Sequence, residues 1–376
     1  MSALTPPHHR WIATAEALDA ACRDVEGASI LALDTEFFRE NTFFPVPALI
    51  QFSAGQTAYL IDPVAVECTP AFRALLQNSA LKLLHACSED LEVLKLWAGV
   101  LPAPLVDTQI AQALLGEVPA MGYQKLVEHW VGETLPKEET RSNWLLRPLT
   151  ESQCAYAALD VLYLLEVWAL QSGKLEALGR RAWLMEECEA QLAQAERNAQ
   201  SDALWYTRQR QLWRLAPRQL EAYRLMTTWR EGETRRRDLP RNWLSADKLL
   251  FAVAEAMPKN RFELAAVDGV KPTLVKKEGD TLLELVNTAR HCPEEALPAP
   301  WPDPAEPAFK HRFKALKRVV SAKAEALSIA PEVLMRRRDI EALVMQALAG
   351  EAPTLPTGWR GEILNDGLND ALKESV

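Results

Sequence analysis

Residues 31–38 read LALDTEFF, an apolar run that ends in two acids, Asp34 and Glu36. Side chains two residues apart on an extended strand point to the same face, so these carboxylates are expected side by side. Like charges that close resist ionising together, and a divalent cation is the usual partner that offsets their repulsion. The stretch therefore predicts a strand with a cation site at its end. A second Asp-x-Glu, Asp24-Val25-Glu26, follows a polar stretch and is expected at a solvated helix end or loop.

The composition excludes several classes of protein. A chain of 376 residues is too long for one ordinary core and predicts two or three domains. With 48% hydrophobic and 25% charged residues it is expected to be soluble, without the roughly 20-residue apolar run of a membrane span. The N-terminus lacks the layout of a signal peptide. Six scattered cysteines without a C-x-x-C pair argue against zinc ribbons and disulfides and predict a cytoplasmic location. No Gly-rich phosphate loop is present, which argues against nucleotide binding of the Walker or Rossmann kind.

The net charge of −9 is unevenly distributed. Residues 1–170 carry 10 Lys and Arg against 21 Asp and Glu, whereas the remainder carries 32 against 30. Within the remainder, residues 205–245 hold 10 Arg against 4 acids, and residues 310–338 hold 9 bases against 2. This pattern suits an acidic, metal-dependent catalytic unit followed by modules that contact phosphate. The alternative is that the basic runs are solvated helix ends.

The first 170 residues alternate between strand and helix patterns. Strands are expected in ILALDT, ALIQFSA, TAYLID, LKLLHA and PLVDT, the second and third joined as a hairpin. Helices are expected over residues 64–77, 88–98 with Ser88 as N-cap, 109–115, and 151–170 with Thr150 as N-cap. Hairpin strands followed by β-α-β units predict a mixed sheet covered by helices.

Strand patterns disappear after residue 170. Residues 175–198 read as one long helix that links two regions, and residues 208–290 as several short helices. Residues 293–308 contain six prolines in sixteen residues and predict an extended linker. Residues 309–372 again show helical periodicity, which makes a diverged internal repeat of 208–290 plausible.

Three further side chains are candidate partners for the two acids. Asp90 lies in the first turn of a helix that follows a buried strand, a position that opens towards the strand ends. Asp160 lies among Ala, Leu and Val on a helix, where nothing satisfies a buried carboxylate. Tyr156 lies four residues before it, on the same helix face. Four carboxylates without His or Cys suit a hard cation such as Mg²⁺ or Mn²⁺.

The set is large enough to hold two such ions, the arrangement used for in-line displacement at phosphate. Tyr156 would then orient the attacking water or help to take its proton, although a phenol with a pKa near 10 is a poor base. Each residue also has a structural alternative. Asp90 would complement a helix dipole, Asp160 would pair with an Arg, and Tyr156 would be core packing.

The motifs together resemble those of ribonuclease D, in the tyrosine-bearing branch of the DEDD superfamily of 3′→5′ exonucleases. LDTEF gives Asp34 and Glu36, HACSEDLEVL gives Asp90, and YAALDVLYLL gives Tyr156 and Asp160. The connecting stretches ALIQFS, LVDTQIA and RSNWLLRPLTESQCAYAALD are similar as well. The resemblance implies a ribonuclease H-like α/β exonuclease domain over residues 1–170, with two divalent ions held by the four acids.

The C-terminal half resembles two all-α HRDC domains, which are small helical bundles that contact nucleic acid. The first is expected over residues 208–290, through LPRNWLSADKLLFAVAEAMPKNRFELAAVDGV, and the second over 309–376, through MRRRD and GWRGEI. Residues 171–207 would be a helical linker and 291–308 a Pro-rich linker. The resemblance implies a ring or funnel in which these domains guide RNA to the site.

The expected function is therefore a monomeric 3′→5′ exoribonuclease that releases 5′-monophosphates from precursor tRNA and other small structured RNAs. A DNA exonuclease with the same site, a non-catalytic RNA-binding scaffold and a helicase accessory module are the alternatives.

Other residues near the motifs are read as structural. Asp107 is expected to be structural, and His85 a satisfied core residue or a neighbour of the ligands. Trp97, Trp130 and Trp168 are expected in cores rather than as stacking platforms. Phe37 and Phe38 are expected to pack, with a platform for the terminal base as the alternative.

Overall fold

The computed structural model describes residues 7–373 apart from 117, 137–138, 140–141 and 199–203. Its N-terminal part is built on one six-stranded mixed sheet of order β1-β4-β3-β2-β5-β6. The strands are β1 (His9–Ile12), β2 (Ile30–Phe38), β3 (Val46–Ser53), β4 (Ala58–Ile61), β5 (Leu81–Leu84) and β6 (Leu105–Asp107). The predicted hairpin is confirmed as antiparallel β3 and β4. Strand β2 lies centrally, antiparallel to β3 and parallel to β5, so its end is flanked on both sides.

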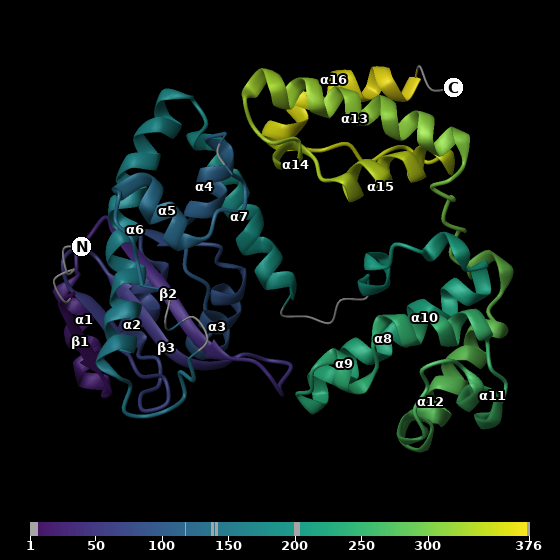
Figure 1. The fold of residues 1–376 in the computed structure, drawn as a ribbon, viewed down its shortest axis with the longest axis horizontal. Coiled ribbons are helices and arrows are strands. Elements are labelled where there is room, and N and C mark those ends of the chain that lie inside the picture. Colours follow the sequence, from purple (N-terminus) through teal and green to yellow (C-terminus); the bar gives the residue numbers. More distant parts are fainter. Residues whose placement is uncertain (1–6, 117, 137–138, 140–141, 199–203, 374–376) are drawn as a thin grey trace.

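Helices cover the sheet and connect its strands (Figure 1). They are α1 (Ala15–Asp24), α2 (Pro70–Gln77), α3 (Ser88–Ala98), α4 (Thr108–Leu114), α5 (Tyr123–Val131), α6 (Glu151–Ala177) and α7 (Arg181–Asn198). The predicted cap Thr150 is confirmed, because its hydroxyl accepts from the Gln153 amide and the Gln153 side chain accepts from the Thr150 amide. Among the described residues, helix α6 has the length and the apolar composition that a membrane-crossing helix would need. It instead packs against β2, β3, β4 and β5 as the central helix of this fold.

Three sequence expectations differ from the structure. Residues 64–69 are not helical, since α2 begins only at Pro70 with Thr69 as its cap. Helix α3 has Cys87, not Ser88, at its N-cap position, and no side chain of its own caps it. The single helix expected over residues 175–198 is two helices, because Gly179 adopts a φ of 66° between α6 and α7.

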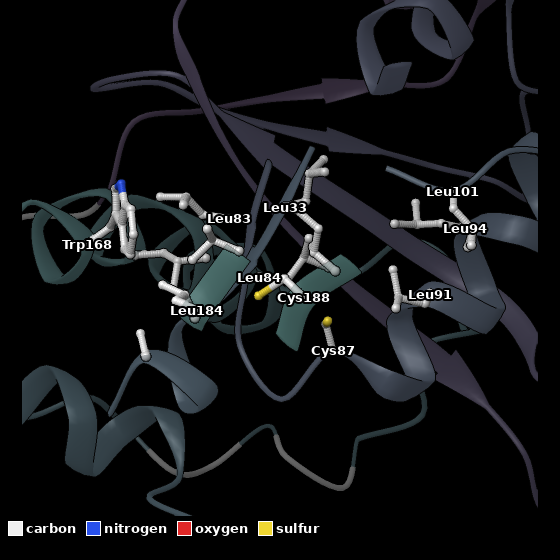
Figure 2. Packing of buried hydrophobic residues seen from close by; sticks show 14 of the residues in the cluster. Leu33, Leu83, Leu84, Cys87, Leu91, Leu94, Leu101, Trp168, Leu184 and Cys188 are labelled. Atoms are coloured by element: carbon white, nitrogen blue, oxygen red, sulfur yellow. The ribbon is translucent and has the colours of Figure 1, made fainter. Parts of the chain in front are cut away.

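Helix α7 is part of the N-terminal domain's core rather than a free connection. It packs on α3, α4 and β6, and Figure 2 shows its Leu184 and Cys188 among buried residues such as Leu84 and Cys87. The expected domain boundary at residue 170 also falls inside α6. The structural unit around the sheet therefore extends well beyond residue 170.

Two helical bundles follow. The first bundle comprises α8 (Pro217–Arg237), α9 (Arg241–Leu244), α10 (Asp247–Ala256), α11 (Arg261–Ala266) and α12 (Pro272–Arg290), preceded by the 3₁₀ turns Trp205–Arg208 and Leu212–Arg214. The second bundle comprises α13 (Pro307–Leu327), α14 (Pro331–Leu334), α15 (Arg337–Leu348) and α16 (Gly358–Lys373). A third 3₁₀ turn, Glu294–Ala296, lies in the Pro-rich linker between the bundles.

The two bundles repeat one plan. A 21-residue helix, α8 or α13, is followed by a four-residue helix and packs against the last helix, α12 or α16. Both long helices end in a left-handed residue, Asp238 with a φ of 49° and Ser328 with a φ of 51°. We call these two residues the helix corners.

The second bundle docks directly on the N-terminal domain. Trp359 is 3% exposed and stacks on Trp183 of α7 at a centroid distance of 4.6 Å. Arg180 donates to the carbonyls of Leu114 in α4 and Leu327 at the end of α13. One continuous apolar cluster consequently runs from the sheet into the second bundle.

Candidate active site

The end of strand β2 carries the first two acids. Asp34 and Glu36 are both partly buried, and the β2–β3 register shifts directly after Glu36. Such irregularities are frequent beside active sites, because they re-aim side chains. Across the sheet, the fully buried Gln51 places its side-chain nitrogen 3.5 Å from an Asp34 oxygen. The strand end thus holds two carboxylates that lie next to a single amide.

Helix α6 brings the third acid to the same place. One oxygen each from Asp34, Glu36 and Asp160 lies within 4.8 Å of the other two. Tyr156, one turn earlier on α6, donates a hydrogen bond to the Asp160 carboxylate. Its ring lies 6.0 Å from that of the buried Trp144. The structure therefore brings together four of the five predicted residues, from two elements more than 110 residues apart in the sequence.

Asp90 lies beside this group but outside the closest set. It is buried in the first turn of α3, and its Oδ1 accepts a 2.6 Å hydrogen bond from Thr35, the residue between Asp34 and Glu36. Its charge contributes to the raised pKa of each of the other three acids. Asp90 is thus an electrostatic neighbour of the cluster that is held by the strand itself.

Asp107 was expected to be structural, and in the structure it fixes the start of α3. Its carboxylate accepts from the backbone amides of Ala86, Cys87 and Gln109 at 2.8–3.0 Å. Ala86 adopts a φ of 53°, which a non-glycine residue keeps only when its surroundings hold it. The carboxylate of Asp107 thereby supplies the constraint that α3 lacks at its own N-cap.

Burial, together with repulsion between neighbouring acids, strongly raises the pKa values of the acids in the site. Burial, and then the charges of Asp90 and Asp160, raise the pKa of Asp34 well above its ordinary value. Burial raises the pKa of Glu36 to about 9 and that of Asp90 to about 6. The pKa of Asp160 is also raised well above its ordinary value, mainly by burial. Without added positive charge the cluster therefore retains protons near neutral pH.

The donor set fits hard divalent cations. All four acids offer oxygen, the ligand that Mg²⁺ and Mn²⁺ prefer, and three of them converge within 4.8 Å. Burial raises the pKa of all four acids, and repulsion within the cluster raises those of Asp34, Glu36 and Asp160 further. A bound cation would offset that repulsion. Asp34, Glu36, Asp90 and Asp160 are consequently the residues that would hold the metal.

Sequence reasoning missed three residues around the cluster. These are Thr35, Gln51 and Tyr123, whose hydroxyl donates to the Leu159 carbonyl and whose pKa is raised by burial and by Asp160. Thr35 was visible inside the motif as a buried polar position, whereas Gln51 and Tyr123 reach the acids only through the fold. No local pattern marks residues of that kind.

Other candidates lie where their structural interpretation placed them. His85 contacts the Thr108 hydroxyl and the Met121 carbonyl, so both ring nitrogens are satisfied. Trp97, Trp130 and Trp168 belong to apolar clusters. Phe37 and Phe38 are partly exposed opposite Pro47 and Val46, and their role stays a prediction.

The second Asp-x-Glu is confirmed at a helix end. Asp24 is the last residue of α1. Its carboxylate accepts from Arg10 and from the Tyr59 hydroxyl. The partners of Asp24 are therefore Arg10 and Tyr59, and it is not among the three acids that converge at the end of β2.

Three family models match successive parts of the chain. The model described as 3′-5′ exonuclease matches residues 9–172. The HRDC domain matches residues 219–286, and the C-terminal HRDC domain of ribonuclease D matches residues 307–368. The predicted α/β domain followed by two helical HRDC-type bundles is confirmed.

Curated relatives are similar over their whole length. Ribonuclease D of Pseudomonas paraeruginosa is 40% identical, with 99% of this chain and 100% of the relative covered. Ribonuclease D of Escherichia coli is 37% identical, with 98% and 99% covered.

A solved structure gives the same result. The crystal structure of Escherichia coli RNase D, described as an exoribonuclease involved in structured RNA processing, matches with a TM-score of 0.88 at 36% identity. That match covers 98% of this chain and 99% of the solved one. The chain therefore belongs to the ribonuclease D family.

Proposed function

We propose that this chain is a metal-dependent 3′→5′ exoribonuclease that removes nucleotides singly from RNA 3′ ends and releases 5′-monophosphates. The observation that carries the proposal is the convergence of Asp34, Glu36 and Asp160 within 4.8 Å at the end of β2, with Asp90 held beside them. Family membership supports RNA as the substrate, because the relatives are ribonucleases.

The four acids would hold two divalent ions, Mg²⁺ or Mn²⁺. When bound, such a pair supplies a nucleophilic water at neutral pH and stabilises the leaving oxygen of an in-line displacement. The protein's part is to keep four carboxylates in place despite their repulsion. The central sheet, the hydroxyl of Thr35 and the packing of α6 perform that task.

Tyr156 is assigned the orientation of the attacking water. Burial and the charge of Asp160 raise the pKa of its phenol above the ordinary value of 10. The hydroxyl therefore stays protonated near neutral pH and acts as a hydrogen-bond donor rather than as a base. Its position beside Asp160 places that donor at the edge of the carboxylate cluster.

The preferred substrates are proposed to be precursor tRNA and other small structured RNAs with short 3′ extensions. In this proposal residues 1–170 carry catalysis, and the bundles in 208–290 and 309–376 guide the RNA. The basic side chains of the bundles, such as Arg337 and Arg338 at 77% and 72% side-chain exposure, support sequence-independent phosphate contacts. A cytoplasmic location is proposed as well, supported by six free cysteines. A monomeric state is a separate part of the proposal.

The test is digestion of a tRNA precursor with a 3′ extension, in Mg²⁺, in Mn²⁺ and in EDTA, with Asp34→Asn as the matched variant. We expect stepwise 3′ shortening that requires metal and is lost in Asp34→Asn, while RNA binding remains within about twofold. A DNA strand of the same sequence in parallel lanes separates RNA from DNA specificity.

Two outcomes would contradict the proposal. Trimming by Asp34→Asn at the parent rate would show that the carboxylate cluster is not the catalytic site. RNA that is bound but not shortened in either metal would move the assignment to a binding scaffold, or to a DNA exonuclease if the DNA lane shortens.

A further inference from the structure

The connection between β2 and β3 leaves the sheet and reaches the first bundle near α9 (Figure 1). We call residues 39–44 the docking segment. It begins three residues after Glu36, and its Phe43 is only 3% exposed although it lies in a loop. The first bundle supplies much of that cover, because Arg235 and Arg241 lie over the Phe43 ring at 4.7 and 4.6 Å.

Asp238, the helix corner of the first bundle, accepts hydrogen bonds from the backbone of the docking segment. Oδ1 of Asp238 accepts from the amides of Phe43 and Phe44, at 2.9 and 3.0 Å. The left-handed conformation at Asp238 ends α8 at the point of contact. One carboxylate thus replaces the backbone partners that these two loop amides lack.

The cations above Phe43 are themselves held in place. Arg241 donates to both oxygens of Glu231, a fully buried acid of α8, and its guanidinium also lies 3.9 Å from the Trp205 ring centre. Arg208 lies over the same ring at 4.0 Å. Arginine and aromatic groups therefore alternate across the joint, an arrangement that is strengthened by desolvation.

The docking segment is also tied to the helix that carries Asp90. Arg39 pairs with Glu92 of α3 at 2.7 Å and donates to the Phe43 carbonyl at 2.6 Å. A cleft of about 480 Å³ follows the joint, and its lining includes Arg39 and Glu89 from one side and Trp205 and Asn242 from the other. Contacts thus run from the first bundle to two of the three elements that supply acids to the site, namely β2, through the docking segment that follows it, and α3.

We infer that the docking segment fixes the first bundle relative to the active site, and that Phe43 and Asp238 are positioning residues for structured RNA. The RNA part of this inference rests on the proposed function, whereas the docking itself does not. A short single strand reaches the carboxylates without the bundle. A structured RNA, whose body must rest on the bundle while its 3′ end is in the site, needs the two at a fixed distance.

The chain offers a matched pair of variants at Asp238. Asp238→Gly keeps the left-handed backbone and removes the acceptor, whereas Asp238→Asn keeps an acceptor oxygen and tolerates the same backbone. Arg236→Ala is the control on the same helix end, because Arg236 is exposed and forms its ion pair with Glu233 of the same helix rather than with the docking segment. Phe43→Ala tests the segment from the opposite side.

The first readout is hydrogen exchange at the Phe43 and Phe44 amides, which requires no RNA. We expect Asp238→Gly to lose protection there, with Asp238→Asn and Arg236→Ala close to the parent. Protection that is unchanged in Asp238→Gly would overturn the docking role of Asp238.

The second readout is kinetic, with a 3′-extended tRNA precursor compared against a short single-stranded RNA in Mn²⁺. For Asp238→Gly and Phe43→Ala we expect KM for the precursor to rise about tenfold, with kcat for the short strand within about twofold of the parent. Equal losses on both substrates, or no loss on either, would overturn the positioning role. If the parent trims no RNA at all, the proposed function fails together with the positioning role, and the exchange result still decides the docking.

Discussion

At the scale of single residues, the site is a group of acids that the fold forces together. Asp34, Glu36 and Asp160 approach within 4.8 Å, and burial raises the pKa of each. Such an arrangement costs folding free energy unless positive charge compensates. The chemistry of the site and the stability of the fold are therefore linked through the same side chains.

The raised pKa values determine how the stability of the metal-free protein changes with pH. In the metal-free protein the folded state holds protons on Asp90 and Glu36 more firmly than the unfolded state does. Their pKa values rise from 3.8 to about 6 and from 4.5 to about 9, so stability is lost as pH rises through this window. Bound cations favour the ionised acids and should reverse the loss. We expect the Tm gain produced by saturating Mn²⁺ to be larger at pH 8 than at pH 6, as measured by calorimetry.

Asp34→Asn is the control for this experiment, because it removes one charge from the cluster without changing its size. We expect the Mn²⁺-induced gain to shrink at both pH values in this variant. An equal gain at pH 6 and pH 8 in the parent would show that the acids do not titrate together with metal binding.

Tyr156→Phe separates orientation of water from metal binding. The variant loses only the hydroxyl that donates to Asp160. We expect kcat to fall about ten- to a hundredfold, while the Mn²⁺ affinity measured by titration calorimetry changes less than twofold. A large loss of metal affinity would assign the hydroxyl to the metal site instead.

At the scale of elements, the position of α3 depends on one side chain outside it. The Asp107 carboxylate accepts hydrogen bonds from three backbone amides, two of which lie just before α3. Asp107→Ala leaves those donors buried without a partner, and we expect a loss of about 2–4 kcal/mol in the free energy of unfolding by urea titration. Cleavage should fall as well, because Asp90 would no longer be held. Asp107→Asn keeps an acceptor oxygen and should lose less stability and less cleavage activity than Asp107→Ala. If the two variants lose the same amount, the charge of Asp107 matters rather than its hydrogen bonds.

The sequence was informative about elements wherever the pattern is local. The apolar run before Asp34, the cap at Thr150 and the hairpin of β3 and β4 each follow from residues close together, and all were predicted. The start of α3 was placed on Ser88 because Ser is a good cap, yet an acid 20 residues away holds the turn. The break at Gly179 was missed because the apolar spacing continues across it.

At the scale of the whole molecule, the N-terminal domain contacts both helical bundles, and the two bundles are joined to each other. The first bundle contacts the docking segment, the second bundle contacts α4 and α7, and the Pro-rich linker joins the two bundles (Figure 1). The contact between Phe43 and Asp238 spans 195 residues. No sequence pattern predicts such a contact, because each partner alone has the sequence of an ordinary loop or helix end. The domains could thus be predicted, but not their docking.

A pair of glycine variants tests the docking of the second bundle. Gly116 has a φ of 88°, and a Cβ there would collide with the Ser328 carbonyl of the second bundle. Gly132 has a similar φ of 82° but open space around it. Gly132→Ala should therefore show only the backbone cost of about 1–2 kcal/mol, and Gly116→Ala should lose more in urea unfolding and expose Trp359, as followed by fluorescence. If both variants lose the same free energy of unfolding, the contact between Gly116 and Ser328 does not stabilise the protein.

The two helix corners have a consequence for the history of the molecule. Asp238 and Ser328 occupy the same place in the repeated plan, and both corners touch the N-terminal domain, one at Phe43 and the other at Gly116. If one bundle arose by duplication of the other, the copy brought its own point of attachment with it. The contacts at the two corners then diverged, because Asp238 accepts hydrogen bonds from the Phe43 and Phe44 amides through its side chain, whereas Ser328 brings a backbone carbonyl against Gly116.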